Sequence, residues 1–327
     1  MKPLAIGLSA LVAGLFLASL SVGPAEIGPL DGLAALVMGG DGPETLVMRE
    51  LRLPRALLGV MIGASLGLSG AALQGYLRNP LAEPGLIGVS GSAALGAVLA
   101  IHTGLAAAFT LALPLAGLAG AATGVLLILA LAGPRGGSIT LILAGIAISA
   151  LAAALTSLVL NLSPNPYAAA EIVFWMMGSL ADRSMTHVWL ALPLMLAGGA
   201  ALATLGRGLD ALTLGEDAAE AMGLRLARLR LTLVLGTAAM VGAAVAVAGS
   251  IGFVGLVVPH ILRPFVGARP ARLLWASALG GAAMVLAADL AVRLVLPERD
   301  LKLGVLTAIV GAPLFLHLIY KTRGAHA

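Results

Sequence analysis

The chain has 327 residues, of which 60% are hydrophobic and 10% are charged, with a formal net charge of +4 and a mean hydropathy of +1.06. Soluble domains carry about 25% charged residues, so this composition excludes a water-soluble fold. The absence of cysteine excludes disulfides and thiolate metal sites. Basic residues in such a chain mostly report membrane topology, so no nucleic-acid partner is expected.

Long stretches without any Asp, Glu, Lys or Arg indicate the fold class. Roughly 20 apolar residues cross a bilayer. The 51-residue stretch 84–134 and the 32-residue stretch 231–262 each have room for two crossings, and the 35-residue stretch 136–170 for one crossing and an extra helix. Apolar residues do not alternate with polar ones, which favours helices over a barrel. We predict an all-α membrane protein with about ten transmembrane helices.

The first predicted span covers residues 4–22. Lys2 followed by an apolar run is also typical of a signal peptide, but the run from Pro3 to Val22 is longer than the roughly 7–15 residues of a cleaved core, so we expect a retained span. The later spans are expected at 55–77, 86–101, 106–132, 139–160, 186–206, 230–250, 253–266, 272–295 and 303–320. A short helix at 168–180 follows the fifth span, 139–160. No soluble domain is expected, so residues 1–327 form a single transmembrane domain.

The distribution of charge predicts that both termini are cytoplasmic. With the N-terminus inside, the inner side holds 12 of the 19 basic residues and 5 of the 15 acidic ones, as the positive-inside rule requires. The longest polar connection is 207–229 on the inside and 23–54 on the outside. The inner basic residues are Lys2, Arg78, Arg135, Arg207, Arg225, Arg228, Arg230, Arg263, Arg269, Arg272, Lys321 and Arg323, and the inner acidic ones are Glu83, Asp210, Glu216, Asp217 and Glu220.

Two similar segments predict an inverted repeat. GASLGLSG at 63–70 and GAAVAVAG at 242–249 lie on spans that run in opposite directions in this topology. Eight small residues also match by chance, so both interpretations stand.

The second span follows an arginine cluster, Arg49, Arg52 and Arg55, and carries small residues at every fourth position. Such a stripe allows close packing of two helix backbones. The stripe consists of Gly59, Gly63, Gly67, Ala71 and Gly75.

Few ionisable residues lie within the predicted spans. Asp289 is the main exception, and Arg293 four residues later shares its helix face, so the two are expected to pair. A self-neutralised pair and a site for ion coupling are the two interpretations. None of the three lysines lies in a GxxxxGK sequence followed by Ser or Thr, so a pump built on this chain needs its ATPase on another chain.

The inner connection 207–229 predicts a short amphipathic helix. Gly215 and Gly223 flank it, and Glu216 and Asp217 occupy its first turn, where the helix dipole favours acidic groups. One interpretation is a helix that lies among lipid headgroups, and the other is a rigid peg that fits a groove of a cytoplasmic partner.

Six segments in order resemble the FecCD-type permease family, the membrane subunits of type II ABC importers for iron-siderophores, haem and cobalamin. The resemblance covers residues 49–320 and is specific for the family but not for the cargo. It rests on RLPR at 52–55, NPLAEPGLIGVSG at 79–91, FWMMGSLADRSM at 174–185, TLGEDAAEAMGL at 213–224, GSIGFVGLVVPHILR at 249–263 and LGVLTAIVGAPLFLHLI at 303–319.

The resemblance implies an inverted-repeat permease fold and a role for three groups of residues. Arg52, Arg55 and Arg293 match positions that receive carboxylates of a periplasmic binding protein, although arginines at these helix ends also snorkel as anchors. The cytoplasmic gate is matched by Asn79 and Leu81 and by Ser138 and Ile139. The helix that couples to the ATPase is matched by Leu214, Gly215, Glu216, Ala218, Ala219, Met222 and Gly223.

The second gate turn departs from the family pattern. Its sequence, Gly136 to Thr140, lacks the polar, Ser/Thr-rich form of the cobalamin permease, which leaves the gate chemistry and the cargo open. Four of the five histidines, His102, His187, His260 and His317, lie on different segments without metal-ligand spacing, so no metal site is predicted.

The sequence therefore predicts a non-enzymatic, multi-pass permease of the bacterial inner membrane. The resemblance implies a homodimer, two cytoplasmic ABC ATPases that bind ATP and Mg, and a periplasmic binding protein; the chain itself is expected to bind no cofactor. The expected cargo is an iron(III)-siderophore, then cobalamin, then haem. An ion-coupled secondary transporter that uses Asp289 is the alternative, and a non-transporting scaffold or sensor is a second one.

Overall fold

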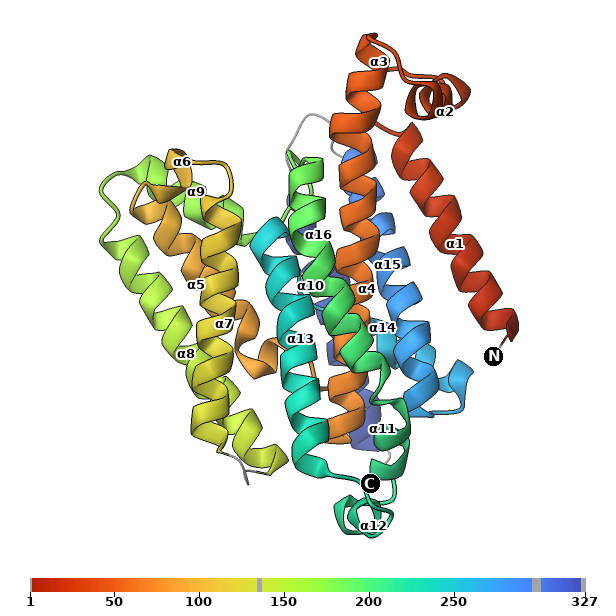
Figure 1. The fold of residues 1–327 in the computed structure, drawn as a ribbon, viewed down its shortest axis with the longest axis vertical. Helices are drawn as coiled ribbons and strands as arrows, with labels where there is room; N and C mark the ends of the chain where they lie inside the picture. The colour runs from red at the N-terminus through yellow and green to blue at the C-terminus, as the bar shows by residue number, and fades with distance from the viewer. Residues whose placement is uncertain (1, 134–136, 296–300, 325–327) are drawn as a thin grey trace.

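The charge-free stretches form the long helices of the molecule (Figure 1). The computed structural model describes residues 2–133, 137–295 and 301–324, and these contain helices and no strand. The helices are α1 (Lys2–Ser21), α2 (Pro29–Met38), α3 (Pro43–Leu46), the π-helical η1 (Val47–Arg52), α4 (Leu53–Leu77), the 3-10 helix η2 (Pro84–Ile87), α5 (Val89–His102), α6 (Leu105–Ala108), α7 (Ala112–Ala132), α8 (Ser138–Asn161), α9 (Pro166–Met176), α10 (Met185–Ala203), α11 (Gly206–Leu212), α12 (Glu216–Ala221), α13 (Leu226–Ala248), α14 (Val254–Leu262), the 3-10 helix η3 (Arg263–Val266), α15 (Pro270–Val295) and α16 (Leu303–Gly324).

Seven helices in the described part of the chain are long and apolar enough to cross a membrane. They include α1, α7, α8, α10, α13 and α15, and a continuous segment from Pro43 to Leu77. The other three predicted spans correspond to the shorter apolar helices Val89–His102, Val254–Val266 and Leu303–His317. The all-helical membrane fold is confirmed, whereas ten crossings and two cytoplasmic termini stay predictions.

Some boundaries differ from the prediction. The expected span 106–132 is divided into α6 and α7, because Phe109 takes an extended conformation (φ −161°) that ends α6. The outer connection 23–54 is largely helical, and α11 lies within the connection 207–229, where the sequence predicted a single short helix.

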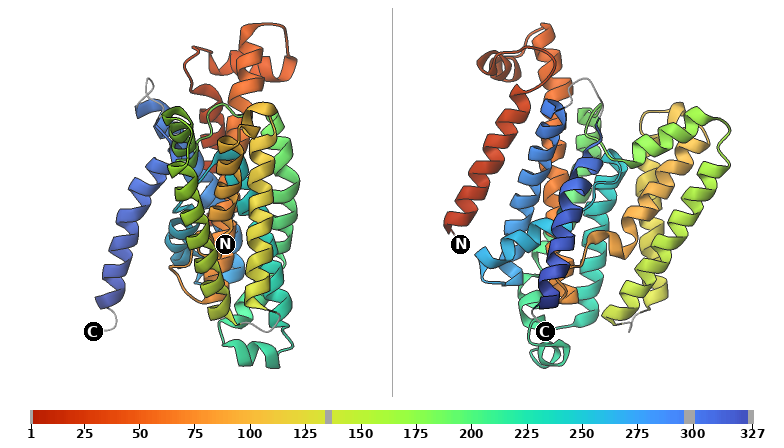
Figure 2. Two further views of the ribbon diagram at one scale, coloured as in Figure 1. Left: turned by 90° about the vertical axis from the view of Figure 1, so that its left-hand side faces the viewer. Right: turned by 180° about the vertical axis from the view of Figure 1, so that it is seen from behind.

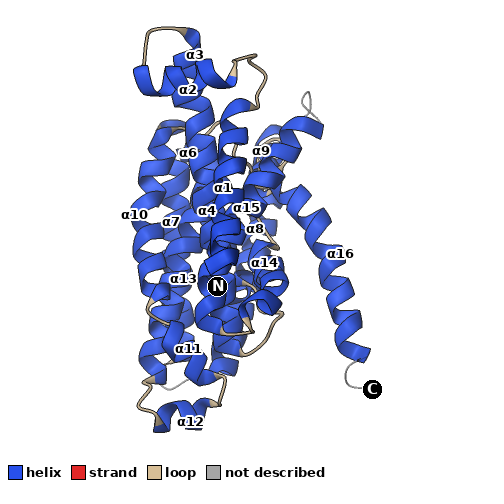
Figure 3. Ribbon diagram, turned by 90° about the vertical axis from the view of Figure 1, so that its right-hand side faces the viewer, coloured by secondary structure: helices blue, strands red, loops and turns tan. Residues whose placement is uncertain are grey.

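Helix α4 lies at the centre of the fold. It packs against α15, α13, α14 and α10, while α5, α7 and α8 form a second group on one side (Figures 1 and 2). Helix α16 contacts α14 and α15 and leans away from the bundle towards its C-terminal end (Figure 3). By the predicted topology, we call the end that carries α2 and α3 the outer end, and the end that carries α12 the inner end.

The two predicted repeat segments lie on helices of opposite direction, α4 and α13, which also contact each other (Figure 1). Each is followed by a shorter helix, α5 or α14. The segments that lead into these helices are similar in sequence, GLIGVSG at 85–91 and GSIGFVG at 249–255, which the sequence analysis did not recognise as a repeat. The architecture is an inverted repeat.

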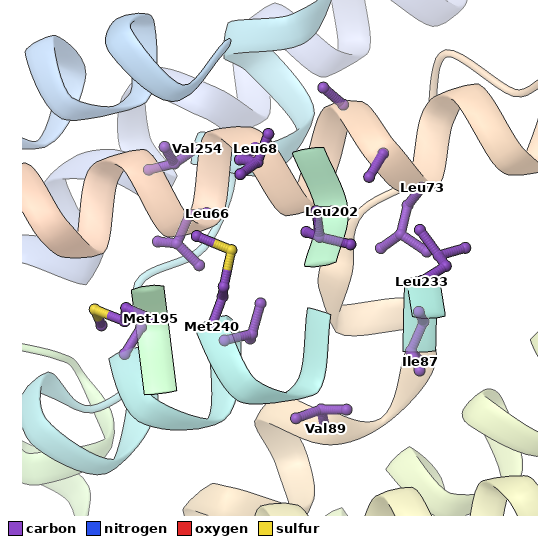
Figure 4. Close-up of a cluster of buried hydrophobic side chains, with 14 of the residues drawn as sticks. Leu66, Leu68, Leu73, Ile87, Val89, Met195, Leu202, Leu233, Met240 and Val254 are labelled. Atoms are coloured by element: carbon purple, nitrogen blue, oxygen red, sulfur yellow. The ribbon is translucent and has the colours of Figure 1, made fainter. Parts of the chain in front are cut away.

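The core lies between α4, α10, α13 and α14. Leu66, Leu68 and Leu73 of α4 face Leu202 of α10 and Met240 of α13 (Figure 4). These side chains are all less than 9% exposed. Van der Waals packing of these side chains holds α4 within the bundle, since lipid tails are as apolar as leucine and supply no hydrophobic drive between helices.

The glycine stripe of α4 faces α15. A Cβ at Gly63 would meet the backbone carbonyl of Gly281, and one at Gly67 would meet that of Ser277. At Gly59 the nearest atom is Cδ2 of Leu286, at 2.9 Å, whereas Gly75 faces Leu209 and Pro270 at 3.4 Å. Two helix backbones are therefore in direct contact at Gly63 and Gly67, where even a methyl group has no room.

We predict that Gly67→Ala destabilises the protein by about 1–3 kcal/mol, because α4 and α15 must move apart to accept the methyl group. The measurement is the thermal unfolding midpoint in detergent. Gly14→Ala on α1, where nothing lies within 4 Å of the added Cβ, is the matched control. An unchanged midpoint for Gly67→Ala would show that the close contact between α4 and α15 does not contribute to stability.

Candidate functional site

At the outer end, Arg52 is buried and closes the end of α1. It is 5% exposed, and its guanidinium donates to the carbonyl oxygens of Leu20 (2.9 Å), Ser21 (3.0 Å) and Ala25. The last carbonyls of a helix have no partner within the helix, and lipid offers none. Arg52 therefore supplies the hydrogen-bond donors that the backbone carbonyl groups at the C-terminal end of α1 lack.

Arg55, Asp289 and Arg293 form an ion-paired cluster beside it. Asp289 Oδ1 lies 2.8 Å from Arg55 Nη2, and Asp289 Oδ2 lies 2.8 Å from Arg293 Nη2. The exposed fractions of the side chains are 22% for Arg55, 9% for Arg293 and 2% for Asp289. The predicted pairing of Asp289 with Arg293 is confirmed, and Arg55 is a third member that the sequence did not reveal.

Arg293 also reaches α1. Its Nη1 donates to the carbonyls of Ser19 (3.0 Å) and Val22 (2.8 Å), and its Nη2 to the Ser19 hydroxyl (2.6 Å). The guanidinium groups of Arg52 and Arg293 are thus occupied by this chain, and Arg55 is the most exposed of the three. Two positive charges on Asp289 also make this carboxylate a poor carrier for a coupling ion.

The outer surface continues at the connection between α9 and α10. Desolvation lowers the pKa of the Arg183 guanidinium there, and the neighbouring carboxylate of Asp182 offsets part of this effect. Asp182 is exposed and adopts a left-handed backbone (φ 57°).

At the inner end, α12 protrudes from the bundle (Figure 1). The predicted helix 215–223 is shorter in the structure, because Gly215 (φ 107°) and Gly223 (φ 87°) adopt left-handed conformations that end it. Ala219 is fully buried against the body and Ala218 and Glu216 are half-buried. Leu214 and Met222 are each 67% exposed. The result is a short rigid helix, anchored by one side and presenting two apolar side chains outward.

The predicted gate residues lie on two turns at the same end. After α4, Arg78 adopts a left-handed conformation (φ 49°), and Asn79 Oδ1 accepts a hydrogen bond from the Leu81 amide at 2.9 Å. Asn79 is exposed and Leu81 is half-buried. On the second turn, Ser138 begins α8 and Ile139 is 71% exposed. Gly136 of this turn lies outside the described residues.

A groove of about 600 Å³ lies between α9 and α16. Met176, Met177, Ser250, Gly304 and Ala308 are among the residues that line it, and none of the described lining residues is charged. A second apolar cavity of about 470 Å³ lies between α5, α7 and α8.

Polar residues inside the protein form a network that the sequence analysis missed. Gln74 of α4 is 1% exposed; its Nε2 donates to the carbonyls of Ala82 (3.3 Å) and Leu256 (3.2 Å), and its Oε1 accepts from Arg263 (2.7 Å). Glu83 accepts from the Phe253 amide. A glutamine at the end of an otherwise apolar helix was the signal available in the sequence.

These features define a class of protein: a polytopic helical permease with an inverted repeat and a protruding inner helix. The profile of the FecCD transport family matches residues 11–321, and the chain belongs to this family of transport permeases.

Named relatives extend over nearly the whole chain. The chain is 38% identical to the ABC transporter permease protein YvrB of Bacillus subtilis (strain 168), over 89% of this chain and 84% of the relative. It is 37% identical to the vitamin B12 import system permease protein BtuC of Klebsiella pneumoniae, over 97% and 93% of the two chains. It is 39% identical to the cobalamin import system permease protein BtuC of Halobacterium salinarum, over 85% and 74%.

A solved structure also matches the fold. It is described as an inward-facing conformation of a metal-chelate type ABC transporter; the TM-score is 0.86 and the identity 33%, over 98% of this chain and 100% of the other. The recognition made from the six sequence segments is therefore confirmed.

We predict that Asp289→Asn lowers stability by about 3–5 kcal/mol, because the change leaves Arg55 and Arg293 close together without their shared counter-charge. The thermal unfolding midpoint measures the loss. Asp41→Asn, at an exposed outer position, removes the same charge without a buried partner and is the control. Equal midpoints for the two variants would contradict the structural role of the cluster.

Proposed function

We propose that the chain is the permease subunit of an ATP-driven importer that moves a metal chelate from the periplasm to the cytoplasm across a bacterial inner membrane. The observation that carries the proposal is α12, a short anchored helix at the inner end that is flanked by the exposed side chains of Leu214 and Met222. Exposed apolar side chains on a short anchored helix are what a groove in a partner protein binds. In this proposal the partner is an ABC ATPase that carries ATP and Mg.

Two copies of the permease are proposed to assemble around the path of the cargo, each with one ATPase. The surface of α16 supports this arrangement, since Ile309 is 62% and Leu316 66% exposed on a helix that leans away from its own bundle (Figure 3). Ile309 also lines the groove between α9 and α16, whose described lining residues carry no charge. Such a wall binds a polar chelate weakly, so the affinity resides in the binding protein.

The outer arginine cluster is proposed to lie where a periplasmic binding protein docks. Arg55 is the member that remains partly exposed for a carboxylate of the partner. Arg52 and Arg293 contribute by fixing the end of α1 beside it. Charges at the rim of an interface mainly steer association and set its register.

The cargo class is a metal chelate. The two relatives named for vitamin B12 or cobalamin import support cobalamin as the first cargo to test, ahead of the iron(III)-siderophore that the sequence had placed first, and of haem. Identities of 37–39% support the transport role more strongly than the choice of chelate.

We expect cargo-dependent transport in proteoliposomes that contain the permease, the ATPase and the binding protein encoded beside it. Cobalamin, an iron(III)-siderophore and haem are offered separately on the binding protein, and uptake and ATP hydrolysis are measured. One of the three cargoes should raise uptake and ATP hydrolysis severalfold over the values measured with the empty binding protein. Uptake that follows an ion gradient without ATPase would overturn the proposal in favour of a secondary transporter.

We expect Glu216→Ala with Met222→Ala to reduce the stimulation of ATP hydrolysis by loaded binding protein at least tenfold while the permease still folds and forms its pair. The changes remove the apolar and charged contacts of the peg with the ATPase. Leu126→Ala on the membrane-crossing helix α7, where Leu126 is 68% exposed, is the control for loss of an exposed apolar side chain. Full stimulation in the double variant would exclude α12 as the coupling helix.

A further inference from the structure

Glu83 lies between the two segments of the inverted repeat, the connection that leads into α5 and the connection that leads into α14. The sequence placed it among the inner loop carboxylates, but the connection 78–88 after α4 turns back into the bundle. Glu83 is half-buried there, and its Oε1 accepts a hydrogen bond from the backbone amide of Phe253 at 2.9 Å. Phe253 immediately precedes α14. One carboxylate thus joins the segments that lead into α5 and α14, the corresponding helices of the inverted repeat.

Phe253 is held in an unfavourable backbone conformation. Its φ of +67° is left-handed, a region that a residue with a bulky side chain rarely adopts. The N-cap residue of α5, by contrast, is Gly88, with φ +78°, where no such penalty exists. Strained residues of this kind persist only where the surrounding contacts hold them. The charged acceptor on Glu83 is one such contact.

The second contact of Phe253 is with α16. A Cβ at Gly311 would meet the Phe253 side chain, so the aromatic residue packs directly against the backbone of α16. Pro313 follows two residues later, where the helix lacks one hydrogen bond. The chain of contacts therefore runs from Glu83 through Phe253 to the part of α16 that borders the groove.

The carboxylate of Glu83 has room to move. It borders a cavity of about 180 Å³ that is also lined by Ser90, Ser250 and the backbone at 249–252. The cavity is lined mainly by apolar residues, but the hydroxyls of Ser90 and Ser250 are alternative hydrogen-bond partners for a carboxylate that leaves the Phe253 amide. The bond to Phe253 is consequently one that a conformational change can break and remake.

We propose that Glu83 is a positioning residue for transport, which couples the inner turn to α16 through the Phe253 amide. Asn79 and Leu81, the predicted gate residues, lie on the same connection as Glu83. While the bond is present, the turn and α16 are fixed relative to each other; when it breaks, Phe253 relaxes and both move. The proposal rests on the transport function proposed above and deepens it.

The test compares Glu83→Ala with Glu83→Gln in the reconstituted importer. The readout is the amount of cargo transported per ATP hydrolysed. Loss of a charge-assisted hydrogen bond shifts a two-state equilibrium roughly tenfold, so Glu83→Ala should lower this ratio about tenfold. Glu83→Gln keeps an oxygen acceptor for the Phe253 amide and should retain most of the ratio. The matched control is Asn165→Ala, which removes a 2.9 Å side-chain acceptor of a backbone amide within α9 alone.

A second variant, Phe253→Gly, tests the proposal independently in case Glu83→Ala does not fold. Phe253→Gly keeps the amide that Glu83 binds and relieves the left-handed strain, but it removes the side chain that contacts α16. Relief of the backbone strain offsets part of the packing lost with the side chain, and the thermal unfolding midpoint checks that the variant folds. The folded variant should still lower the transport ratio. A parental ratio in Phe253→Gly, or in Glu83→Ala, would overturn the proposal.

The outcomes separate this inference from the function on which it rests. Equal defects in Glu83→Gln and Glu83→Ala would show that the charge rather than the hydrogen bond is required, which overturns the positioning role. Absence of ATP-dependent transport in the parent complex would instead overturn the proposed function.

Discussion

The structure depends on one constraint, that a backbone polar group inside a membrane protein finds its partner within the protein. Continuous helices such as α4 and α13 satisfy it by themselves. Where a helix stops, a side chain must complete the hydrogen bonding. At the end of α1 that side chain is Arg52, helped by Arg293. At the connections before α5 and α14 it is Gln74 and Glu83. Arg52, Gln74 and Glu83 are thus explained by the helix interruptions at which they lie.

The same constraint explains how much of the fold could be predicted. Hydropathy and charge located most of the long helices to within a few residues, because a helix that crosses a membrane must be apolar and must pair its own backbone groups. They missed the break at Phe109 and the continuation of the α4 segment back to Pro43. The small residues of α4 indicated close packing, although not the partner, because a stripe of glycines does not specify which backbone it meets. The interrupted segments were harder. The spacing of apolar residues in NPLAEPGLIGVSG does not show that this connection turns back into the protein and places Glu83 there.

The sequence predicted α12 at the inner end better than it predicted the arginine cluster at the outer end. Gly215 and Gly223 marked the ends of α12 because glycine is the residue that favours a left-handed end. The spacing of Asp289 and Arg293 predicted their pairing, since residues four apart share a helix face. It could not include Arg55, which joins them from 234 residues away along the chain. The donors to the end of α1 were equally hidden, because their acceptors are backbone carbonyls, which leave no signature in the sequence.

The distribution of rigid and adjustable contacts indicates where the molecule is able to move. At Gly63 and Gly67, α4 meets α15 backbone to backbone, and the outer end is fastened by ion pairs around Asp289, so these elements are held as one body. The contacts around Phe253 differ in kind: one hydrogen bond to a carboxylate beside a cavity, and one aromatic side chain against α16. An importer must open at one end while the other stays closed. In the coupling proposed above, α4 and α15 are the fixed part, and α16 and the connection after α4 are the moving part. Both meet at Phe253, the residue with the least favourable backbone among these contacts.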